Sequence, residues 1–376
     1  MSETRLGPTA DAAPPTPDHP ARVRATLAAQ PSAAWCVLGR AGLLEPLYHG
    51  TPRRIRRDRL AGLLTELDAA RPVGQTLSVC VQAATVVPLL DEMAAHSPVA
   101  AAIRDAALAG HATVALAATD AGPGSDLAAL DCRLTIEGAD VILDGRKRWI
   151  TNATVADHLL VLARHRPGRH FTSFTWVLVP ATAPGVRVDP ADTPLFTGAG
   201  LGEVEFTDVR LPAAHVVGRR GHGLAAFARH IATERLAGAL WGVALCRRVV
   251  AATAERLAHR VVVDQPLVRH PVVRQSLARA VVRTRQLAAL CDDLGPRVTN
   301  GPDAGAAAAL KVAVADTTRE VLDLCGQLQG ADGFGPAGTQ LTRAEAAVFG
   351  IGGGTTELVL DVVADHLDPL LNGAAA

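Results

Sequence analysis

The sequence predicts an α+β protein with three regions in the order helical, β and helical. Two observations lead to this prediction. Apolar residues recur at helical spacing in the first and last parts of the chain, whereas about 100 residues between them alternate apolar and polar positions and are rich in turn residues. We place the boundaries as follows: a disordered N-terminus at 1–20, an N-terminal α-helical domain at 21–111, a middle β domain at 112–219 and a C-terminal α-helical bundle at 220–376.

In the first region, leucines between 60 and 67 and apolar residues between 86 and 93 fall on helix faces, and Pro72 and Gly74 separate the two sets. In the second, LTIEGADVILDG predicts a hairpin that turns at Gly138 and Ala139, and further short strands follow. Such strands at short spacing are typical of a small barrel or sandwich. The third region has long amphipathic segments separated by proline and glycine, which indicates a helix bundle.

Composition excludes several classes of function. The 376 residues contain 37 Lys+Arg and 37 Asp+Glu, so the basic excess expected of a nucleic-acid or anionic-membrane binder is missing. Six scattered cysteines form no CxxC pair, which favours a reducing cytoplasm. No stretch of about 18 uninterrupted apolar residues predicts a transmembrane helix, and the polar, proline-rich N-terminus does not resemble a signal peptide. The histidine spacing predicts no metal site.

One carboxylate stands on an apolar helix face. At 100° per residue, Glu234 shares a stripe with five other residues, which are Phe227, Ile231, Gly238, Trp241 and Leu245. A carboxylate in such a stripe must find a cation, a hydrogen bond or a raised pKa. One interpretation is a general base for a weakly acidic C–H proton, with Gly238 leaving room for a ligand. The other is a structural ion pair with Arg235 or Arg229.

Three glycine-rich segments, DAGPGSD (120–126), QGADGFG (329–335) and GIGGGT (350–355), permit close approach of the backbone to a flat or phosphorylated ligand. Each is also compatible with an ordinary turn. Together with LAATDAGPGSD, DGRKRWITN, EVEFTDVRLP, ATERLAGALWG and QPL (265–267), and in this order, they make the chain from about Leu90 to Leu371 resemble the acyl-CoA dehydrogenase flavoprotein family.

The resemblance implies a helical domain, a small β-barrel domain and a four-helix bundle, with FAD between the last two. Thr119 matches a threonine near flavin N5, and Trp149 matches a residue that screens the flavin from water. Arg260 and the segment 327–331 match contacts that cross to a neighbouring subunit. The full set of implied FAD-contacting residues is Leu116, Ala118, Thr119, Gly124, Ser125, Trp149, Ile150, Thr151, Arg260, Gln327, Leu328, Gly330, Ala331, Thr355, Thr356 and Glu357.

The resemblance also bears on the catalytic base. Many members carry it where this chain has Gly353, and a minority carry it in an ERL motif on the long helix, where this chain has Glu234. We therefore expect Glu234 to abstract the α-proton of an acyl thioester while the β-hydride passes to flavin N5. The residues implied to bind the substrate are Ser125, Arg235, Gly353 and Gly354.

The expected function is that of an FAD-dependent acyl thioester dehydrogenase. The acyl group is carried by CoA or by an acyl-carrier protein. Departures from the family at Ala347, Val263 and Asp264 favour a specialised, divergent member, and the departure at Ala232, where relatives contact the acyl carrier, favours a biosynthetic role. The expected electron acceptor is an electron-transfer flavoprotein or oxygen, and the expected assembly is a homodimer or homotetramer. Two alternatives stay open: a non-catalytic subunit whose partner supplies the base, and a flavin oxidase or monooxygenase on the same fold.

Overall fold

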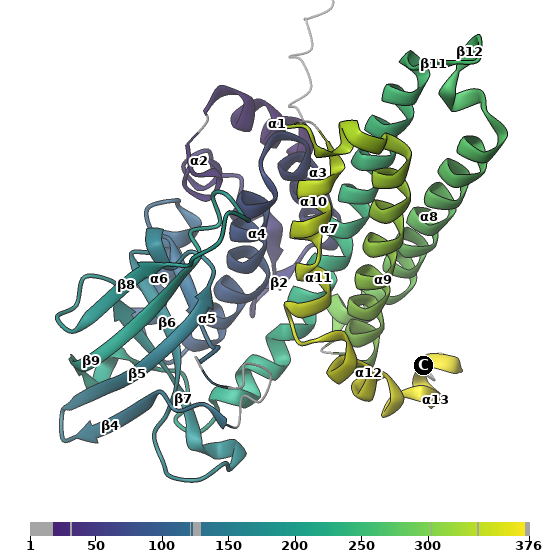
Figure 1. The fold of residues 1–376 in the computed structure, drawn as a ribbon. Helices are drawn as coiled ribbons and strands as arrows, with labels where there is room; N and C mark the ends of the chain where they lie inside the picture. Colours follow the sequence, from purple (N-terminus) through teal and green to yellow (C-terminus); the bar gives the residue numbers. More distant parts are fainter. Residues whose placement is uncertain are drawn as a thin grey trace, which may run out of the picture.

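The computed structural model describes residues 18–30, 32–120, 122, 129–301, 303–336 and 338–372. Helices come first, strands follow, and long helices complete the chain, so the predicted α+β fold is confirmed (Figure 1). The first region contains α1 His19–Ala29, α2 Ala34–Arg40, α3 Arg57–Ala70, α4 Val73–Val81, α5 Val87–Ala94, α6 Pro98–Leu108 and a two-stranded hairpin of β1 Tyr48–His49 and β2 Arg54–Ile55.

The predicted disordered segment extended too far into the chain. Helix α1 begins at His19, where Asp18 accepts a hydrogen bond of 3.0 Å from the Ala21 amide and Pro20 suits the first turn. Val23 and Leu27 are buried on its inner face, and this burial stabilises the helix. The prediction of disorder was therefore wrong for residues 18–20, and residues 1–17 lie outside the described part of the chain.

Strands of the middle region form one eight-stranded sheet in the order β10-β7-β6-β4-β5-β9-β8, with β3 also paired to β6. The predicted hairpin is confirmed, because Glu137 pairs with Asp140 across a turn in which Gly138 has a φ of 62°. The strands are β3 Val114–Ala117, β4 Arg133–Glu137, β5 Asp140–Ile150, β6 His158–Arg164, β7 Phe174–Pro180, β8 Val186–Pro190, β9 Gly202–Pro212 and β10 Val216–Val217.

The last region is a bundle whose fourth helix is broken. Gly353 and Gly354 have φ of 70° and 100°, a left-handed backbone that stops the helix before α12 starts. The elements are α7 Gly223–His259, β11 Val261–Val262, β12 Gln265–Pro266, α8 Pro271–Asn300, α9 Ala304–Gln329, α10 Thr339–Ala346, α11 Val348–Ile351, α12 Thr356–Ala364 and α13 Leu367–Leu371.

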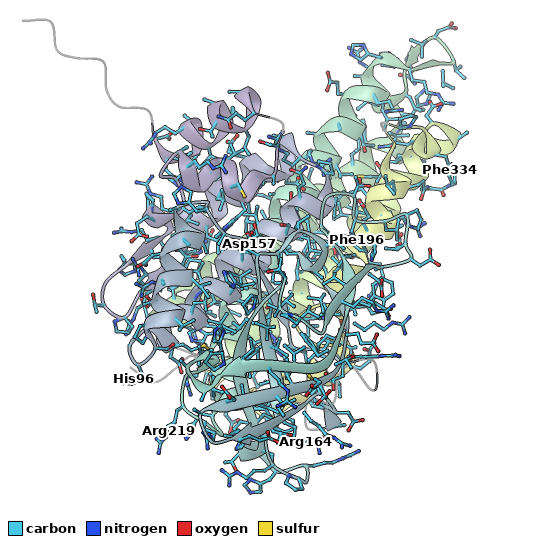
Figure 2. The ribbon with its side chains drawn as sticks, turned by 90° about the vertical axis from the view of Figure 1, so that its left-hand side faces the viewer. His96, Asp157, Arg164, Phe196, Arg219 and Phe334 are labelled. Atoms are coloured by element: carbon cyan, nitrogen blue, oxygen red, sulfur yellow. The ribbon has the colours of Figure 1, made fainter. Side chains whose placement is uncertain are left out.

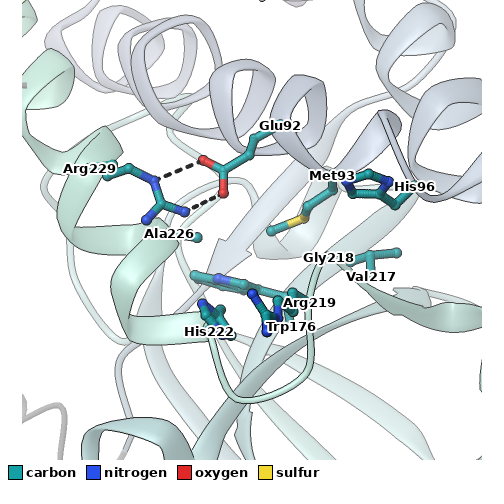
Figure 3. Close-up of a pocket in the computed structure, with 10 residues that line it drawn as sticks. All are labelled: Glu92, Met93, His96, Trp176, Val217, Gly218, Arg219, His222, Ala226 and Arg229. Carbon is teal, nitrogen blue, oxygen red and sulfur yellow. Dashed lines mark hydrogen bonds and ion pairs between the residues drawn. The ribbon is translucent and has the colours of Figure 1, made fainter. Parts of the chain in front are cut away.

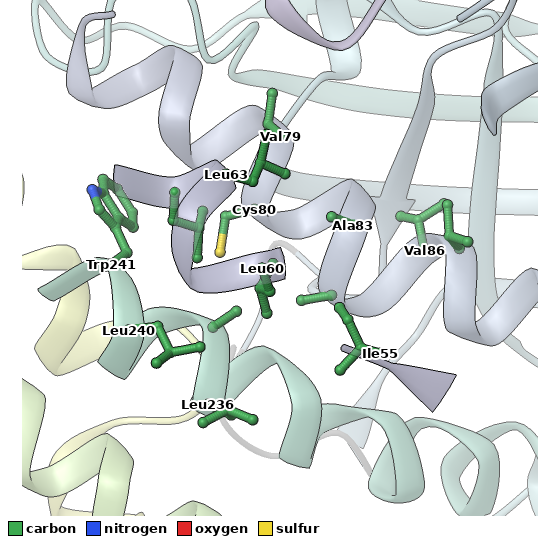
Figure 4. Packing of buried hydrophobic residues seen from close by; sticks show 14 of the residues in the cluster. Ile55, Leu60, Leu63, Val79, Cys80, Ala83, Val86, Leu236, Leu240 and Trp241 are labelled. Atoms are coloured by element: carbon green, nitrogen blue, oxygen red, sulfur yellow. The ribbon is translucent and has the colours of Figure 1, made fainter. Parts of the chain in front are cut away.

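A continuous apolar core joins the N-terminal helices to the bundle. Leu60, Leu63 and Cys80 from α3 and α4 belong to the same buried cluster as Leu240 and Trp241 of α7 (Figure 4). A separate apolar cluster consists mainly of buried residues from the strands of the middle region. The shared core fixes α7 against α4 and α5, and these helices carry the groups described below.

In the described part of the chain, two helical segments are long and apolar enough to cross a membrane by length and composition alone, or three if the bent pair Thr339–Ile351 and Thr356–Ala364 is taken as one span. The first two are Val73–Ala94 and Gly223–His259, and 72% of the most apolar window of each is buried inside the protein. Their apolar character thus serves the shared core, since both line the contact between the N-terminal helices and the bundle.

Candidate active site

The Glu234 side chain is held by a hydroxyl from the N-terminal helices. Thr85 Oγ1 donates a hydrogen bond of 2.5 Å to Glu234 Oε2. Thr85 lies in a single π-helical turn, Gln82–Val86, between α4 and α5. Because a π turn rotates the following residues relative to an α-helix, it sets the direction in which Thr85 points toward α7. Such turns often occur at functional sites.

Neither Arg229 nor Arg235, the two cations proposed as ion-pair partners, forms an ion pair with Glu234 among the described contacts. Arg229 is paired with Glu92, and Arg235 Nε donates to the carbonyl oxygen of Gly353 at 3.1 Å. Burial raises the pKa of Glu234, and this effect outweighs the Thr85 hydrogen bond and the positive charge of Arg235, which both lower it. A carboxylate with a raised pKa is a stronger base than one exposed to water.

Glu234 lines a cavity between the N-terminal helices and the bundle. A methyl group added at Gly238, one turn along α7, would meet no atom within 4 Å. The expectation that Gly238 leaves room beside the carboxylate is therefore confirmed. The remaining lining comes from α4, α7, α9 and α11 and is mostly apolar: Leu77, Cys80, Val81, Arg235, Trp241, Lys311, Val314, Val348, Phe349, Gly352 and Gly353.

The break in the fourth helix brings Gly353 to the same place as Glu234. A Cβ added to Gly353 would lie 3.7 Å from Glu234 Oε1 and 3.6 Å from Arg235 Cγ. The two positions at which the resembling family places its base are thus neighbours in space. Since the Glu234 carboxylate already lies beside Gly353, a second carboxylate there would add a like charge at close range.

Lys311 is a second buried cation at this site. Its Nζ donates to Thr356 Oγ1 at 3.1 Å, and Thr356 Oγ1 donates in turn to the carbonyl oxygen of Gly350 at 3.3 Å. Burial and the nearby charge of Arg235 lower the pKa of Lys311 to about 8. These bonds hold the turn that contains Gly353 against α9.

Removing the Thr85 hydroxyl tests how Glu234 is held. We expect Thr85→Val to move the acidic limb of kcat/KM for an acyl thioester to higher pH, because loss of the hydrogen bond raises the pKa of Glu234 further. A carboxyl group must be ionised to accept a proton, so any activity that depends on Glu234 as a base falls as the pH drops through that pKa. The loss is therefore largest on the acidic limb and disappears at high pH, where both proteins carry the carboxylate.

The matched control is Thr85→Ser, which keeps the hydroxyl and restores the pH profile. An unchanged profile for Thr85→Val would show that the hydrogen bond does not tune Glu234.

The aromatic side chain of Trp149, in the middle domain, is exposed to solvent. Trp149 is 51% exposed although its backbone has a left-handed φ of 55°, a conformation that costs about 1–3 kcal/mol for such a residue. Ile150, next to it, is buried and anchors the strand end. The Arg148 amide donates to the Thr119 carbonyl at 3.1 Å, so the two segments predicted to contact a flavin lie side by side.

A buried ion pair locks these two segments together. Lys147 is 1% exposed, and its Nζ donates to Asp120 Oδ1, to the Ala118 carbonyl at 3.1 Å and to the Leu162 carbonyl at 2.7 Å. Asp120 also accepts a bond of 2.9 Å from the Cys132 amide. Every charge is therefore satisfied, which is the condition for a stable buried pair.

Other predicted residues lie away from this centre. Arg260 is exposed at the end of α7, 26 residues beyond Glu234 and so about 39 Å along the helix. The segment Gln327, Leu328, Gly330 and Ala331 is half-buried or exposed at the end of α9. Within one chain, neither group shares a site with Glu234.

The remaining predicted residues fall into three groups. Leu116 and Ala118 lie on or next to β3, and Thr151 follows β5 directly. Thr355, Thr356 and Glu357 open α12 directly after Gly354, beside the Glu234 site. Gly124 and Ser125 lie outside the described residues.

Sequence reasoning missed Thr85, Lys147 and Lys311. No sequence motif contains Thr85, because its role depends on a π turn that brings it to a residue 149 positions away. Lys311 did carry a signal, because it stands in a run of otherwise apolar or small residues at a position that a helix pattern predicts to be buried. Lys147 carried none, because it stands between Arg146 and Arg148.

Comparisons with known proteins agree with this arrangement. Residues 115–209 match a family model described as acyl-CoA dehydrogenase, middle domain, and residues 221–367 match one described as acyl-CoA dehydrogenase, C-terminal domain. An acyl-[acyl-carrier-protein] dehydrogenase, MbtN, from a Mycobacterium species is 30% identical over 285 residues, which cover 72% of this chain and 70% of the relative. MbtN of Mycobacterium bovis is 28% identical and covers 73% of this chain and 71% of its own.

Solved structures share the fold at lower identity. A probable acyl-CoA dehydrogenase from Mycobacterium abscessus has a TM-score of 0.82 and 22% identity, covering 93% of this chain and 96% of its own. A structure described as the FAD complex of PigA has a TM-score of 0.80 and 18% identity, covering 89% of both chains.

Proposed function

This chain belongs to the acyl-CoA dehydrogenase family, and from that premise we propose that it is an FAD-dependent dehydrogenase of an acyl thioester with Glu234 as its base. The observation that carries the proposal is the half-buried Glu234 carboxylate, held by Thr85 and facing the open space beside Gly238. A carboxylate that is held by one hydrogen bond and also faces open space favours a general base over a purely structural role.

The residues of the middle domain fit FAD. The strained, exposed Trp149 presents a flat apolar face beside Thr119, as a wall for an isoalloxazine ring requires. When bound, FAD supplies the two-electron acceptor that takes a hydride from the acyl β-carbon. We assign Trp149, Ile150, Thr151 and Thr119 to holding it within one chain.

The roles of the protein groups follow from their positions. Glu234 takes the α-proton, and Thr85 keeps the carboxylate directed into the cavity. The backbone N–H of Gly353 polarises the thioester carbonyl, which stabilises the negative charge that develops on its oxygen. Arg235 fixes the carbonyl of Gly353 and so holds the turn that contains this N–H, and the apolar lining excludes water.

The relatives named acyl-[acyl-carrier-protein] dehydrogenase favour a carrier-bound acyl group over a CoA ester.

The decisive test is the visible spectrum of the purified, FAD-supplemented protein under anaerobic conditions. We expect flavin absorption at about one per chain and its bleaching on addition of an acyl thioester. A colourless protein that does not take up FAD would contradict the proposal. The rate at which the bleached sample regains colour in air decides between oxygen and an electron-transfer flavoprotein as acceptor.

Filling the space beside Glu234 is expected to block the substrate. Gly238→Leu should raise KM for an acyl thioester at least tenfold without loss of flavin, because its side chain enters the cavity. Gly238→Ala is the control: its Cβ has open space, and replacing a helical glycine stabilises the fold by roughly 0.5–1 kcal/mol. If Gly238→Leu has normal KM, the acyl group binds elsewhere.

We further propose that the protein is a homo-oligomer. The bundle exposes large apolar side chains that a monomer leaves in water, among them Val282, Leu341, Ile351 and Leu358. Arg260 and the end of α9 also need a neighbouring copy to take part in an FAD site. Light scattering should give a dimeric or tetrameric mass. A monomeric mass with full flavin content would contradict both the oligomer and the part of Arg260 and the end of α9 in an FAD site.

A further inference from the structure

Two segments of the middle region are strongly basic although the protein as a whole is neutral. The segments RHRPGRH (164–170) and HVVGRRGH (215–222) contain five arginines and four histidines, with no aspartate or glutamate. The first connects β6 to β7, and the second leads from β10 to α7. Positive charge is thus concentrated at two connections rather than spread over the surface.

The fold places these two connections side by side. Val217 of β10 pairs with Trp176 of β7, and a Cβ added to Gly221 would lie 2.9 Å from the Thr172 carbonyl and 3.6 Å from Arg166 Nη2. Burial and the charges of Arg166 and Arg220 lower the pKa of His165, which reflects this concentration of charge. In the view of Figure 2, Arg219 lies between His96 and Arg164 near the lower end of the molecule.

This basic surface, defined by Arg166, Arg219, Arg220 and His222, borders a cavity of about 400 Å³. Arg219 and His222 line it, together with Met93 and Trp176 (Figure 3). Glu92 also lines the cavity, but it is bonded to Arg229 and, at 2.8 Å, to His230. The bonds from His230 and Arg229 lower the pKa of Glu92 to about 2, so its charge is compensated within the protein.

Helix α7 leads from this surface toward the reactive carboxylate. From His222 at the start of α7 to Glu234 is twelve residues, about 18 Å along the helix axis. The extended arm of a phosphopantetheine group has about this reach. A carrier protein docked at the basic surface would therefore hold its thioester near Glu234 without entering the protein itself.

We propose that the basic surface formed by Arg166, Arg219, Arg220 and His222 docks an acidic, phosphopantetheine-bearing acyl-carrier protein. This inference rests on the proposed acyl thioester dehydrogenase function and names the partner that presents the substrate. Arginines without compensating carboxylates speed and orient the association of an oppositely charged partner. Arg219 and Arg220 are both exposed, and among the described residues neither has an acidic partner within salt-bridge distance.

The test is the affinity of the FAD-loaded protein for a fluorescently labelled, acidic bacterial acyl-carrier protein bearing its phosphopantetheine arm. We expect Arg219→Glu/Arg220→Glu to weaken binding at least tenfold and to reduce its salt dependence. Arg40→Glu is the matched control, an exposed arginine at the end of α2, and should bind as the unaltered protein does. Flavin bleaching by an acyl-pantetheine, which has neither protein nor phosphate, should be the same in the unaltered protein, the double variant and the Arg40→Glu control.

Unaltered carrier binding by Arg219→Glu/Arg220→Glu would overturn the proposal. So would a loss of affinity for an acyl-CoA of the same chain length while carrier binding is kept, because that result assigns the arginines to a phosphate group. Bleaching by acyl-pantetheine separates this inference from the function on which it rests. If the unaltered protein is bleached but does not bind the carrier, only the docking proposal fails.

Discussion

Replacing Glu234 by glutamine is expected to lower turnover of an acyl thioester by roughly 10²–10⁴-fold, the contribution of a positioned general base. Glutamine has nearly the same shape and still accepts the hydrogen bond from Thr85, but it cannot take the α-proton. Flavin content and thermal stability should therefore stay close to those of the unaltered protein. Stopped-flow bleaching of the bound flavin by an acyl thioester measures the chemical step directly.

Glu345→Gln is the matched control for this experiment. Glu345 is also a buried carboxylate whose pKa is raised by burial, and it accepts a hydrogen bond of 2.7 Å from the Phe196 amide. It does not line the cavity beside Glu234. Equal turnover for Glu234→Gln and the unaltered protein would remove Glu234 as the base and favour the non-catalytic subunit.

Removing the ammonium group of Lys147 should have the largest effect on stability. Lys147→Met leaves the buried Asp120 carboxylate without its cation, and breaking a buried ion pair in this way costs about 3–5 kcal/mol. The free energy of unfolding in urea measures the loss. Because the pair joins the segments that end in Thr119 and Trp149, we also expect weaker FAD binding in protein that remains folded.

Arg146→Met serves as the comparison, one position away. Arg146 pairs with Glu205 on the exposed face of β5, and an exposed pair contributes about 0–1 kcal/mol. A similar small loss for Lys147→Met would mean that water or local rearrangement solvates Asp120. In that case the pair would not be the link between the two segments that we propose to contact the flavin.

Glu234 could be identified from the sequence because its signal is local. One charge in an apolar stripe of a regular helix is visible from 3.6-residue periodicity alone, and the open space at Gly238 follows from the same helix geometry. The hairpin at Gly138 was predictable for the same reason, since a turn and its flanking strands lie within a few residues of one another. The start of α1 was predicted less well, because the Asp18 cap and Pro20 follow a polar, proline-rich segment, and the burial of Val23 and Leu27 that stabilises the helix depends on tertiary packing.

The sequence by itself thus determined the order of the three regions, the position of the carboxylate on its helix and the resemblance to a flavoprotein family. Only the tertiary structure decided which group holds that carboxylate, because Thr85 meets Glu234 through a π turn and the packing of two distant helices. It likewise decided that Gly353 lies beside Glu234 and that two basic connections form one surface. Periodicity can be recognised from residues that are close in the sequence, whereas these contacts depend on how separate elements bury their apolar faces against one another.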